Sequence, residues 1–161
     1  MKTFTIIFAS LLFNGALVAQ QKKEAANCII AKNKPTEINM STMQKNVFGK
    51  DLQMASMDPI TGYFRTGYCN TDGNDRGLHV VAAVVTKEFL EYSKSQGNDL
   101  MTPYPENNFP GLVPGNVWCL CVLRWKEALD KGVAPPVILE ATNIKALDFV
   151  SLEELKAHKS E

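Results

Sequence analysis

The sequence predicts an α+β fold, a small two-layer α/β sandwich in which a few-stranded sheet is covered by helices mainly on one face. Two observations lead to this prediction. Residues 79–85 form a short run that is apolar on both faces and rich in β-branched residues, which is typical of a central strand. Helical patterns then outnumber such strands along the rest of the chain. With 161 residues, 45% hydrophobic and 21% charged, the chain suits one domain plus an extra segment.

The first 19 residues have the layout of a secretory signal peptide. Lys2 precedes a largely apolar stretch from Phe4 to Val18, and the small residue Ala19 stands before a polar run. The stretch falls short of the about 20 predominantly apolar residues that span a bilayer. We therefore expect cleavage after Ala19, no stable membrane span after cleavage, and a periplasmic or secreted protein in a compartment that permits disulfides. An uncleaved anchor is the alternative.

The rest of the chain divides into an arm and a domain. Residues 20–45 are polar and lack a sustained period, so we expect a linker or loosely packed arm. Residues 46–161 form the single globular domain. Its first part, residues 58–77, is called the glycine-rich loop here, and its glycines favour an ordered loop over a helix or a long strand; they are Gly62, Gly67, Gly73 and Gly77.

After the strand at 79–85, Thr86 is placed to cap a helix over residues 87–96, with Gly97 as its stop signal. Residues 98–116 follow as a second long loop with four prolines, called the proline-rich loop here. A loop of this length is uncommon in a compact domain unless it has a function. We therefore expect this loop to take part in a site.

The next helix is expected to start after Asn116 and to end at Gly132. Its apolar residues recur at helical spacing and predict one buried stripe; they are Trp118, Cys121, Val122, Trp125 and Leu129. On this interpretation Cys121 is buried, both tryptophans pack in the core, and Cys119 lies at the flank of the stripe.

Two more elements complete the domain. Residues 135–141 are apolar and follow two prolines at the start of a predicted strand, where missing amide donors matter least. Ser151 and Glu154 have the spacing of a capping box, with Val150 and Leu155 at the positions of a hydrophobic staple. A last helix is therefore expected from Leu152.

The charge balance argues against nucleic acid as a partner. Seventeen basic residues match seventeen acidic ones, and no basic stripe is present. Phosphate binding depends on clustered lysines and arginines. The partners that remain are a small molecule or a protein of the cell envelope.

Several segments in order resemble an uncharacterised bacterial family, the domain of unknown function 2237. They are "DPITGYFRTGYCNTDGNDRGLH", "EFLEYSKSQGNDLMTP", "FPGLVPG", "WCLCVLRWKEAL" and "GVAPPVILEAT". The resemblance extends from about Asn46 to His158 and supports the fold class, but it implies no activity. The chain departs from the family's pattern at Ala82, where a cysteine is frequent, and at Asn143, where a histidine is frequent.

The thiols allow a zinc site as an alternative interpretation. The soft ligands are Cys69, His79, Cys119 and Cys121, which together supply the donors that tetrahedral zinc accepts. Structural zinc sites usually pair cysteines with two residues between them, whereas Cys119 and Cys121 have one. Residues two apart point in different directions on a helix. We therefore expect no cofactor and keep zinc as the alternative.

A reactive thiol is a further alternative. In the first turn of the predicted helix, Cys119 would meet free backbone amides that favour a thiolate, and with His79 it could act as a nucleophile. Structural roles are favoured, because cysteines of exported proteins are commonly buried or paired. Cys69 is a better partner for Cys119 than Cys28, although four cysteines allow three complete connectivities.

The favoured function is an exported, non-catalytic binding or structural protein of the cell envelope, whose ligand surface is made by the glycine-rich and proline-rich loops. The alternative is a thiol-dependent or metal-binding enzyme. Arg65 can hold an anion with two parallel hydrogen bonds, although pairing with a carboxylate such as Asp75 is the competing role. The candidate ligand-binding residues are Arg65, Asn70, Asp75, Asn98 and Asp99.

Overall fold

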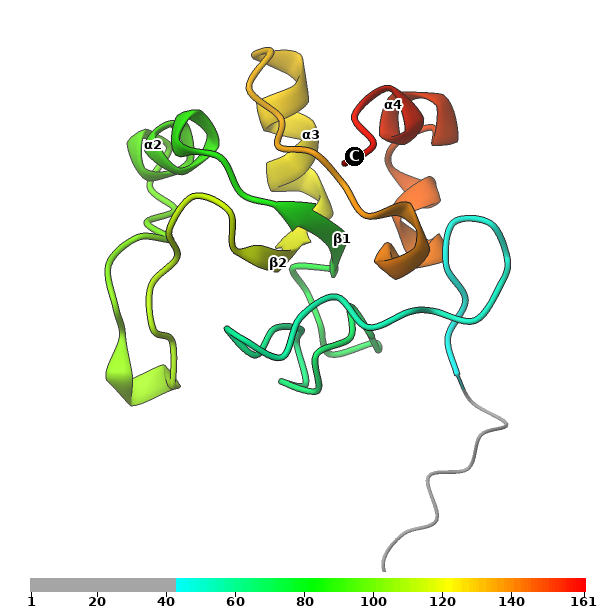
Figure 1. Ribbon diagram of the computed structural model, residues 1–161, viewed down its shortest axis with the longest axis horizontal. Coiled ribbons are helices and arrows are strands. Elements are labelled where there is room, and N and C mark those ends of the chain that lie inside the picture. Colours follow the sequence, from blue (N-terminus) through cyan, green and yellow to red (C-terminus); the bar gives the residue numbers. More distant parts are fainter. Residues whose placement is uncertain (1–42) are drawn as a thin grey trace, which may run out of the picture. The chain divides into compact units, whose positions relative to one another are not determined.

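The computed structural model describes residues 43–161 (Figure 1). The predicted signal peptide, Cys28 and most of the predicted arm lie outside this range. The elements are strands β1 (His79–Val84) and β2 (Val117–Cys121), helices α2 (Lys87–Ser95), α3 (Val122–Asp130) and α4 (Leu152–Ala157), and 3-10 turns η2 (Pro105–Asn107), η3 (Leu139–Ala141) and η4 (Ile144–Asp148).

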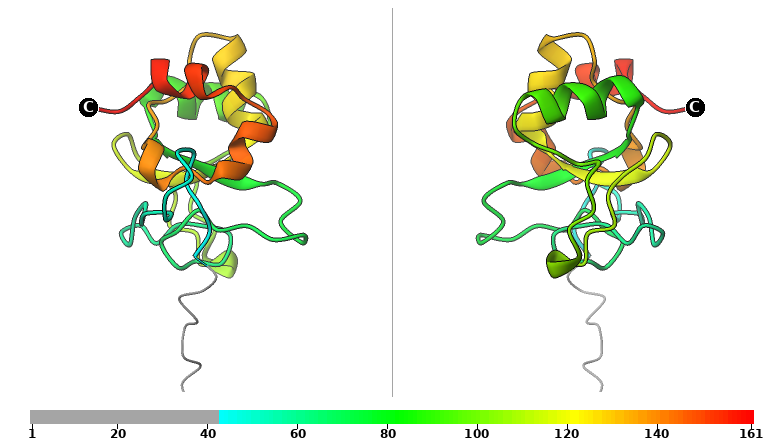
Figure 2. Two further views of the ribbon diagram at one scale, coloured as in Figure 1. Left: turned by 90° about the vertical axis from the view of Figure 1, so that its right-hand side faces the viewer. Right: turned by 90° about the vertical axis from the view of Figure 1, so that its left-hand side faces the viewer.

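The predicted fold class is confirmed. Strands β1 and β2 form a two-stranded antiparallel sheet in which Ala82 pairs with Cys119 and Val84 with Val117. Helices α2, α3 and α4 lie on one side of the strands, and the glycine-rich and proline-rich loops lie on the other (Figures 1 and 2). Within residues 43–161, no helix is both long and apolar enough to cross a bilayer.

The core lies between the sheet and the helices. Val81 and Ala83 of β1 pack there with Trp125 of α3, all of them buried. The Trp125 indole donates a hydrogen bond to the carbonyl of Pro135 at 3.0 Å, so its polar group is satisfied in the core. A second, smaller cluster on the loop side contains Cys69, Ala82, Cys119 and Ala141.

The helix predicted from Asn116 to Gly132 is wrong in its first part. Residues 117–121 form strand β2, and helix α3 begins only at Val122. Pairing with β1 supplies these residues with a ladder of hydrogen bonds, and this partner is distant in sequence and therefore absent from a local pattern. In a strand, residues two apart point to the same face, so the helical distinction between a buried and a flanking thiol does not apply. The predicted burial of the thiols is wrong: Cys119 is 1% exposed, and Cys121, the last residue of β2, is half-buried.

The strand predicted at 135–141 is also wrong. Val137 makes isolated bridges, antiparallel to Ala83 and parallel to Lys159, and residues 139–141 form the turn η3. Pro135 and Pro136 have no amide hydrogen to donate, which limits the ladder on this side of β1.

Helices α2 and α4 start where the sequence predicted. The Thr86 hydroxyl accepts a hydrogen bond from the Phe89 amide at 3.1 Å, and α2 ends one residue earlier than predicted, at Ser95. In α4, the Ser151 hydroxyl accepts from the Glu154 amide, while the Glu154 carboxylate accepts from the Ser151 amide at 2.7 Å. Both members of the predicted staple, Val150 and Leu155, are buried.

Candidate functional site

One residue of β2 holds both ends of the segment 61–69. The Cys119 amide donates a hydrogen bond to the Thr61 hydroxyl at 2.8 Å, and the Cys119 sulfur forms a disulfide with Cys69. Thr61 and Cys69 have no exposed surface. The segment is thus fixed to the sheet at its beginning and at its end. The predicted pairing of Cys69 with Cys119 is confirmed, although the helix on which we placed Cys119 was wrong.

The backbone conformation of this segment determines the direction in which Arg65 points. Gly62 and Gly67 have φ values of +91° and +84°, a region in which residues with side chains are strained. Arg65 itself has φ of +53°, which is uncommon for a residue other than glycine. Its guanidinium carbon lies 4.7 Å from the centroid of the Trp118 ring. The turn therefore brings a cation onto the face of an aromatic residue of β2.

His79, at the start of β1, is oriented by a buried carboxylate. Its ring Nδ1 lies 2.6 Å from Asp75 Oδ1, and its backbone amide donates to Asp75 Oδ2 at 2.8 Å. The Thr71 hydroxyl donates to the same oxygen at 3.0 Å. The Asp75 side chain is fully buried, whereas the His79 side chain is 40% exposed.

These contacts set the charge of Asp75. Burial alone would raise the pKa of this carboxyl group, but hydrogen bonds from the His79 amide and ring and from Thr71 outweigh it, and the pKa lies below its ordinary value. An ionised carboxylate requires a proton on Nδ1 of His79. The other ring nitrogen, Nε2, is thereby left available as an acceptor in the neutral ring or a donor in the charged one.

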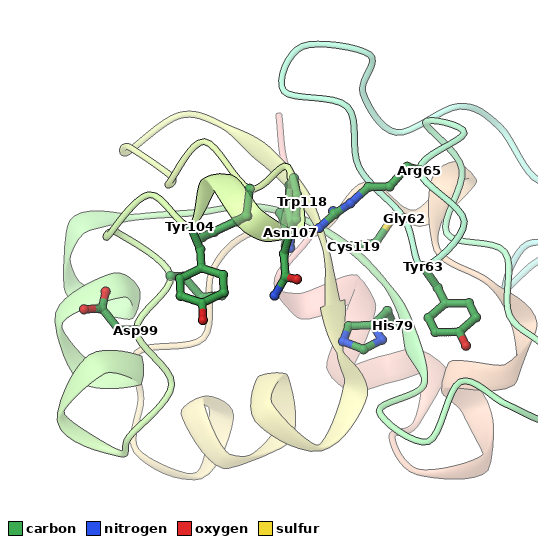
Figure 3. A pocket seen from close by; sticks show the side chains of 11 residues that line it. Gly62, Tyr63, Arg65, His79, Asp99, Tyr104, Asn107, Trp118 and Cys119 are labelled. Atoms are coloured by element: carbon green, nitrogen blue, oxygen red, sulfur yellow. The ribbon is translucent and has the colours of Figure 1, made fainter.

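A cavity of about 350 Å³ lies between the glycine-rich and proline-rich loops, against His79 and β2 (Figure 3). We call it the two-loop cavity. Arg65, His79 and Asp99 line it, and the disulfide residue Cys119 contributes to its wall. Aromatic side chains from both loops and from β2 surround these groups; they are Tyr63, Tyr104, Phe109 and Trp118.

Asp99 differs from Arg65 because its carboxylate already has partners within the loop. It is 2.9 Å from Lys94 Nζ, and it accepts hydrogen bonds from the amides of Met101 and Thr102 and from the Thr102 hydroxyl. The hydrogen bond from Lys94, followed by those from Thr102, holds the pKa of Asp99 far below its usual range. Asp99 therefore orders the start of the proline-rich loop.

The other predicted ligand-binding residues have different positions. Asp75 lies behind His79 and supports it. Asn98 donates to the Ser93 hydroxyl at 2.9 Å and borders a smaller cavity of about 230 Å³ that also contacts His79, Cys121 and Arg124. Asn70 is half-buried and does not line the two-loop cavity. Arg65 and Asp99 are therefore the two predicted ligand-binding residues that reach it.

The four predicted thiol and imidazole ligands are not arranged as a metal centre. Cys69 and Cys119 are bonded to each other, and within residues 43–161 no three histidine, cysteine, aspartate or glutamate side chains are close enough to share an ion. Cys121 has a free thiol and is paired opposite His79 in the ladder. Catalysis by Cys119 with His79, or zinc binding, would require the reduced protein and stays a prediction.

The aromatic residues of the cavity were missed by the sequence analysis. Trp118 was assigned to the core, and it does pack there, but it also lines the cavity. Tyr63 and Tyr104 are 41% and 52% exposed, which is a large exposed fraction for an aromatic residue. Their positions in the two loops next to glycines and prolines were the signal that could have identified them. A hollow of about 490 Å³ elsewhere contains none of the predicted site residues.

Comparison with known proteins identifies a family, but this family has no assigned activity. The family described as "Uncharacterized protein conserved in bacteria (DUF2237)" matches residues 45–159. No curated protein matches the chain.

Proposed function

The chain belongs to the DUF2237 family, and we propose that it is a non-catalytic domain that binds a small molecule in the two-loop cavity. The observation that carries the proposal is that the two loops expected from the sequence to form a ligand surface border this cavity together. Its volume of about 350 Å³ lies within the range of about 300–1,000 Å³ that is typical of ligand pockets.

The anchoring of the loops supports this function. Segment 61–69 is fixed at both ends to Cys119, and Asp99 orders the start of the opposite loop. A pocket whose walls are ordered before the ligand arrives loses less conformational entropy on binding. The described residues that line the cavity include no serine, no threonine and no free thiol, so nothing in this wall supports a serine, threonine or cysteine nucleophile.

The proposal includes export to the periplasm or the medium, with a role in the cell envelope. The pattern of Lys2, the apolar stretch to Val18 and Ala19 supports it, as does a buried disulfide, which persists in oxidising compartments. Fractionation of the native host with sequencing of the amino terminus tests it. A mature chain that begins at Gln20 outside the cytoplasm is expected, and full-length protein in the cytosol would contradict it.

The two tryptophans provide a test of binding. Trp118 lines the cavity, whereas Trp125 is fully buried in the core. Each indole N–H gives one resonance in a nitrogen-15 correlation spectrum, so Trp125 is an internal control. Titration with a panel of neutral, cationic and anionic single-ring compounds is expected to shift the Trp118 resonance for at least one class and to return the compound unchanged. Shifts confined to residues far from the cavity would contradict the proposal.

Thiol-dependent chemistry is a second candidate, favoured by the position of Cys121 opposite His79 beside the smaller cavity. Its test is the rate at which iodoacetamide alkylates Cys121 at neutral pH. A rate well above that of glutathione, reduced in a His79→Ala variant, would favour this candidate. A rate equal to or below that of glutathione would contradict thiol-dependent chemistry and leave binding as the only candidate function.

A further inference from the structure

The ionisable side chains at the two-loop cavity differ in whether they already have a partner. The Asp99 carboxylate is 2.9 Å from Lys94 Nζ, and the Asp75 carboxylate, behind the wall, is hydrogen-bonded to the His79 ring. Arg65 forms no ion pair with a carboxylate among the described residues. Its side chain is half-buried, and this burial lowers the pKa of the guanidinium group because it disfavours the charged form. A cation held in this way is complementary to an anion.

We propose that the ligand of the two-loop cavity is a small organic carboxylate with a flat ring, whose carboxylate binds Arg65 and whose ring packs on the aromatic wall. The proposal rests on the function proposed above and names the class of molecule.

The orientation of Arg65 suits a carboxylate. Figure 3 shows its side chain extending from the loop toward Trp118. The guanidinium carbon lies over the Trp118 ring, 4.7 Å from its centroid. The N–H groups of a guanidinium form a planar fork that can donate two parallel hydrogen bonds to a carboxylate. His79 Nε2 is a second polar group of the same cavity.

The position of Arg65 is held by the backbone. Its left-handed φ of +53° carries a cost, and both ends of its segment are fixed to Cys119. Strain of this kind persists only where the surroundings enforce it, and here it directs the one uncompensated charge of the described cavity wall into the cavity.

The aromatic wall accounts for the ring of the ligand. Phe109 and Trp118 contact each other edge to face with centroids 5.4 Å apart, and Tyr63 and Tyr104 are exposed at the cavity. Aromatic faces of this kind bind planar apolar groups. A volume of about 350 Å³ is near the lower limit for ligand pockets, which favours a ligand with a single ring over one the size of a nucleotide.

The test uses four probes that separate charge from ring: benzoate, benzyl alcohol, benzylamine and acetate. Each is titrated into the oxidised wild-type protein, and its dissociation constant is obtained from the shift of the Trp118 indole resonance. We expect benzoate to bind about tenfold or more tightly than benzyl alcohol and benzylamine, since a charge-assisted pair of hydrogen bonds adds to the ring contact. Acetate is expected to bind more weakly than benzoate, because it lacks the ring.

Variants connect the preference to Arg65. Arg65→Gln is expected to weaken benzoate binding about tenfold and to leave benzyl alcohol unchanged, and Arg65→Lys to restore binding in part, because lysine keeps the charge without the planar fork. Arg76→Gln is the matched control, since Arg76 is an exposed arginine of the same loop that does not line the cavity.

The outcomes separate this proposal from the function on which it rests. Equal dissociation constants for benzoate and benzyl alcohol would contradict the proposal that the ligand has a carboxylate and would leave the cavity as a binding site. Equal dissociation constants for acetate and benzoate would contradict the proposal that the ligand has a ring. A shift of Trp118 with none of these probes, nor with the wider panel described above, would overturn both proposals. Because the wild-type comparison decides the ligand class, it holds even if a variant of Arg65 fails to fold.

Discussion

Thr61 and Cys119 are 58 positions apart in the sequence and joined by one buried hydrogen bond, in which the Cys119 amide donates to the Thr61 hydroxyl at 2.8 Å. The backbone group of a strand is thereby satisfied by a side chain from a loop. This bond defines where the segment that carries Arg65 starts, as the disulfide to Cys69 defines where it ends.

Replacement of the Thr61 hydroxyl is expected to destabilise the domain. Thr61→Val keeps the size of the side chain but leaves the buried Cys119 amide without an acceptor, which costs about 1–3 kcal/mol. The free energy of unfolding, measured with urea, should fall by this amount. Thr61→Ser retains the hydroxyl and is the matched control, with a smaller loss. Equal stability of the valine variant and the wild type would show that the hydrogen bond is replaced by another.

Removal of the disulfide should reduce both stability and binding. A crosslink over a sequence separation of 50 residues contributes about 4 kcal/mol in the chain-entropy model. The double variant Cys69→Ala with Cys119→Ala is expected to lose about this amount and to bind ring carboxylates more weakly, since the end of the Arg65 segment loses its covalent attachment to β2 and keeps the hydrogen bond from Asn143 to the carbonyl of residue 69. Cys121→Ser is the control, because that cysteine has no disulfide partner within residues 43–161. Unchanged affinity in a folded double variant would separate the crosslink from the site.

Gly62 is expected to tolerate no side chain. Its φ is +91°, and a Cβ atom there would collide with the carbonyl group of Tyr68. Gly62→Ala should therefore destabilise the domain by about 1–3 kcal/mol, the usual cost of enforced backbone strain. Gly73→Ala in the same loop is the control, because nothing lies within 4 Å of a Cβ atom at that position. Comparable midpoints for the two variants in a urea titration would contradict this account of the loop.

Glu154 predicts a dependence of stability on acid pH. Hydrogen bonds from the Ser151 amide and from Lys126 lower the pKa of its carboxyl group from 4.5 to about 2. A group whose pKa is depressed by folding stabilises the folded state above its unfolded pKa and loses this contribution as the pH falls through the folded one. The stability difference between wild type and Glu154→Gln should therefore be full above about pH 4.5 and vanish near pH 2.

The size of that difference is limited by solvent. The Glu154 side chain is 36% exposed, so we expect about 1 kcal/mol, as for other helix caps. Glu153→Gln is the control, since Glu153 is an exposed residue of the same first turn. A pH-independent difference between wild type and Glu154→Gln would show that packing, and not charge, is lost.

The sequence predicted those elements whose signals are local. Helices α2 and α4 begin at their caps, Thr86 and Ser151, because the residues that satisfy the first turn are three positions away in the chain. Strand β2 was predicted as a helix, because Trp118 and Cys121 have helical spacing, and the partner that makes them a strand, β1, is about 40 residues distant. Non-local pairing of this kind leaves no mark on a periodic pattern.

The candidate site, like the fold, was predicted in part. The two loops, Arg65, His79 and Asp99 were identified by composition and chemistry, and they do meet at one cavity. The roles of Asp75 behind His79 and of Trp118 beneath Arg65 were not, because they depend on how the loops return to the sheet. The pairing of Cys69 with Cys119 was right for a reason that was partly wrong, since it assumed a helix.

Because one of the two attachments at Cys119 is a disulfide, the site is complete only after the cysteines are oxidised. In a newly made chain the cysteines are reduced, and of the two attachments of segment 61–69 to Cys119 only the Thr61 hydrogen bond can form. Oxidation adds the second attachment and fixes Arg65 over the cavity. Under the export that we propose, oxidation follows translocation. The precursor would then pass through the cytoplasm with an immature pocket, and the protein would compete for its ligand only after delivery to the compartment where it works.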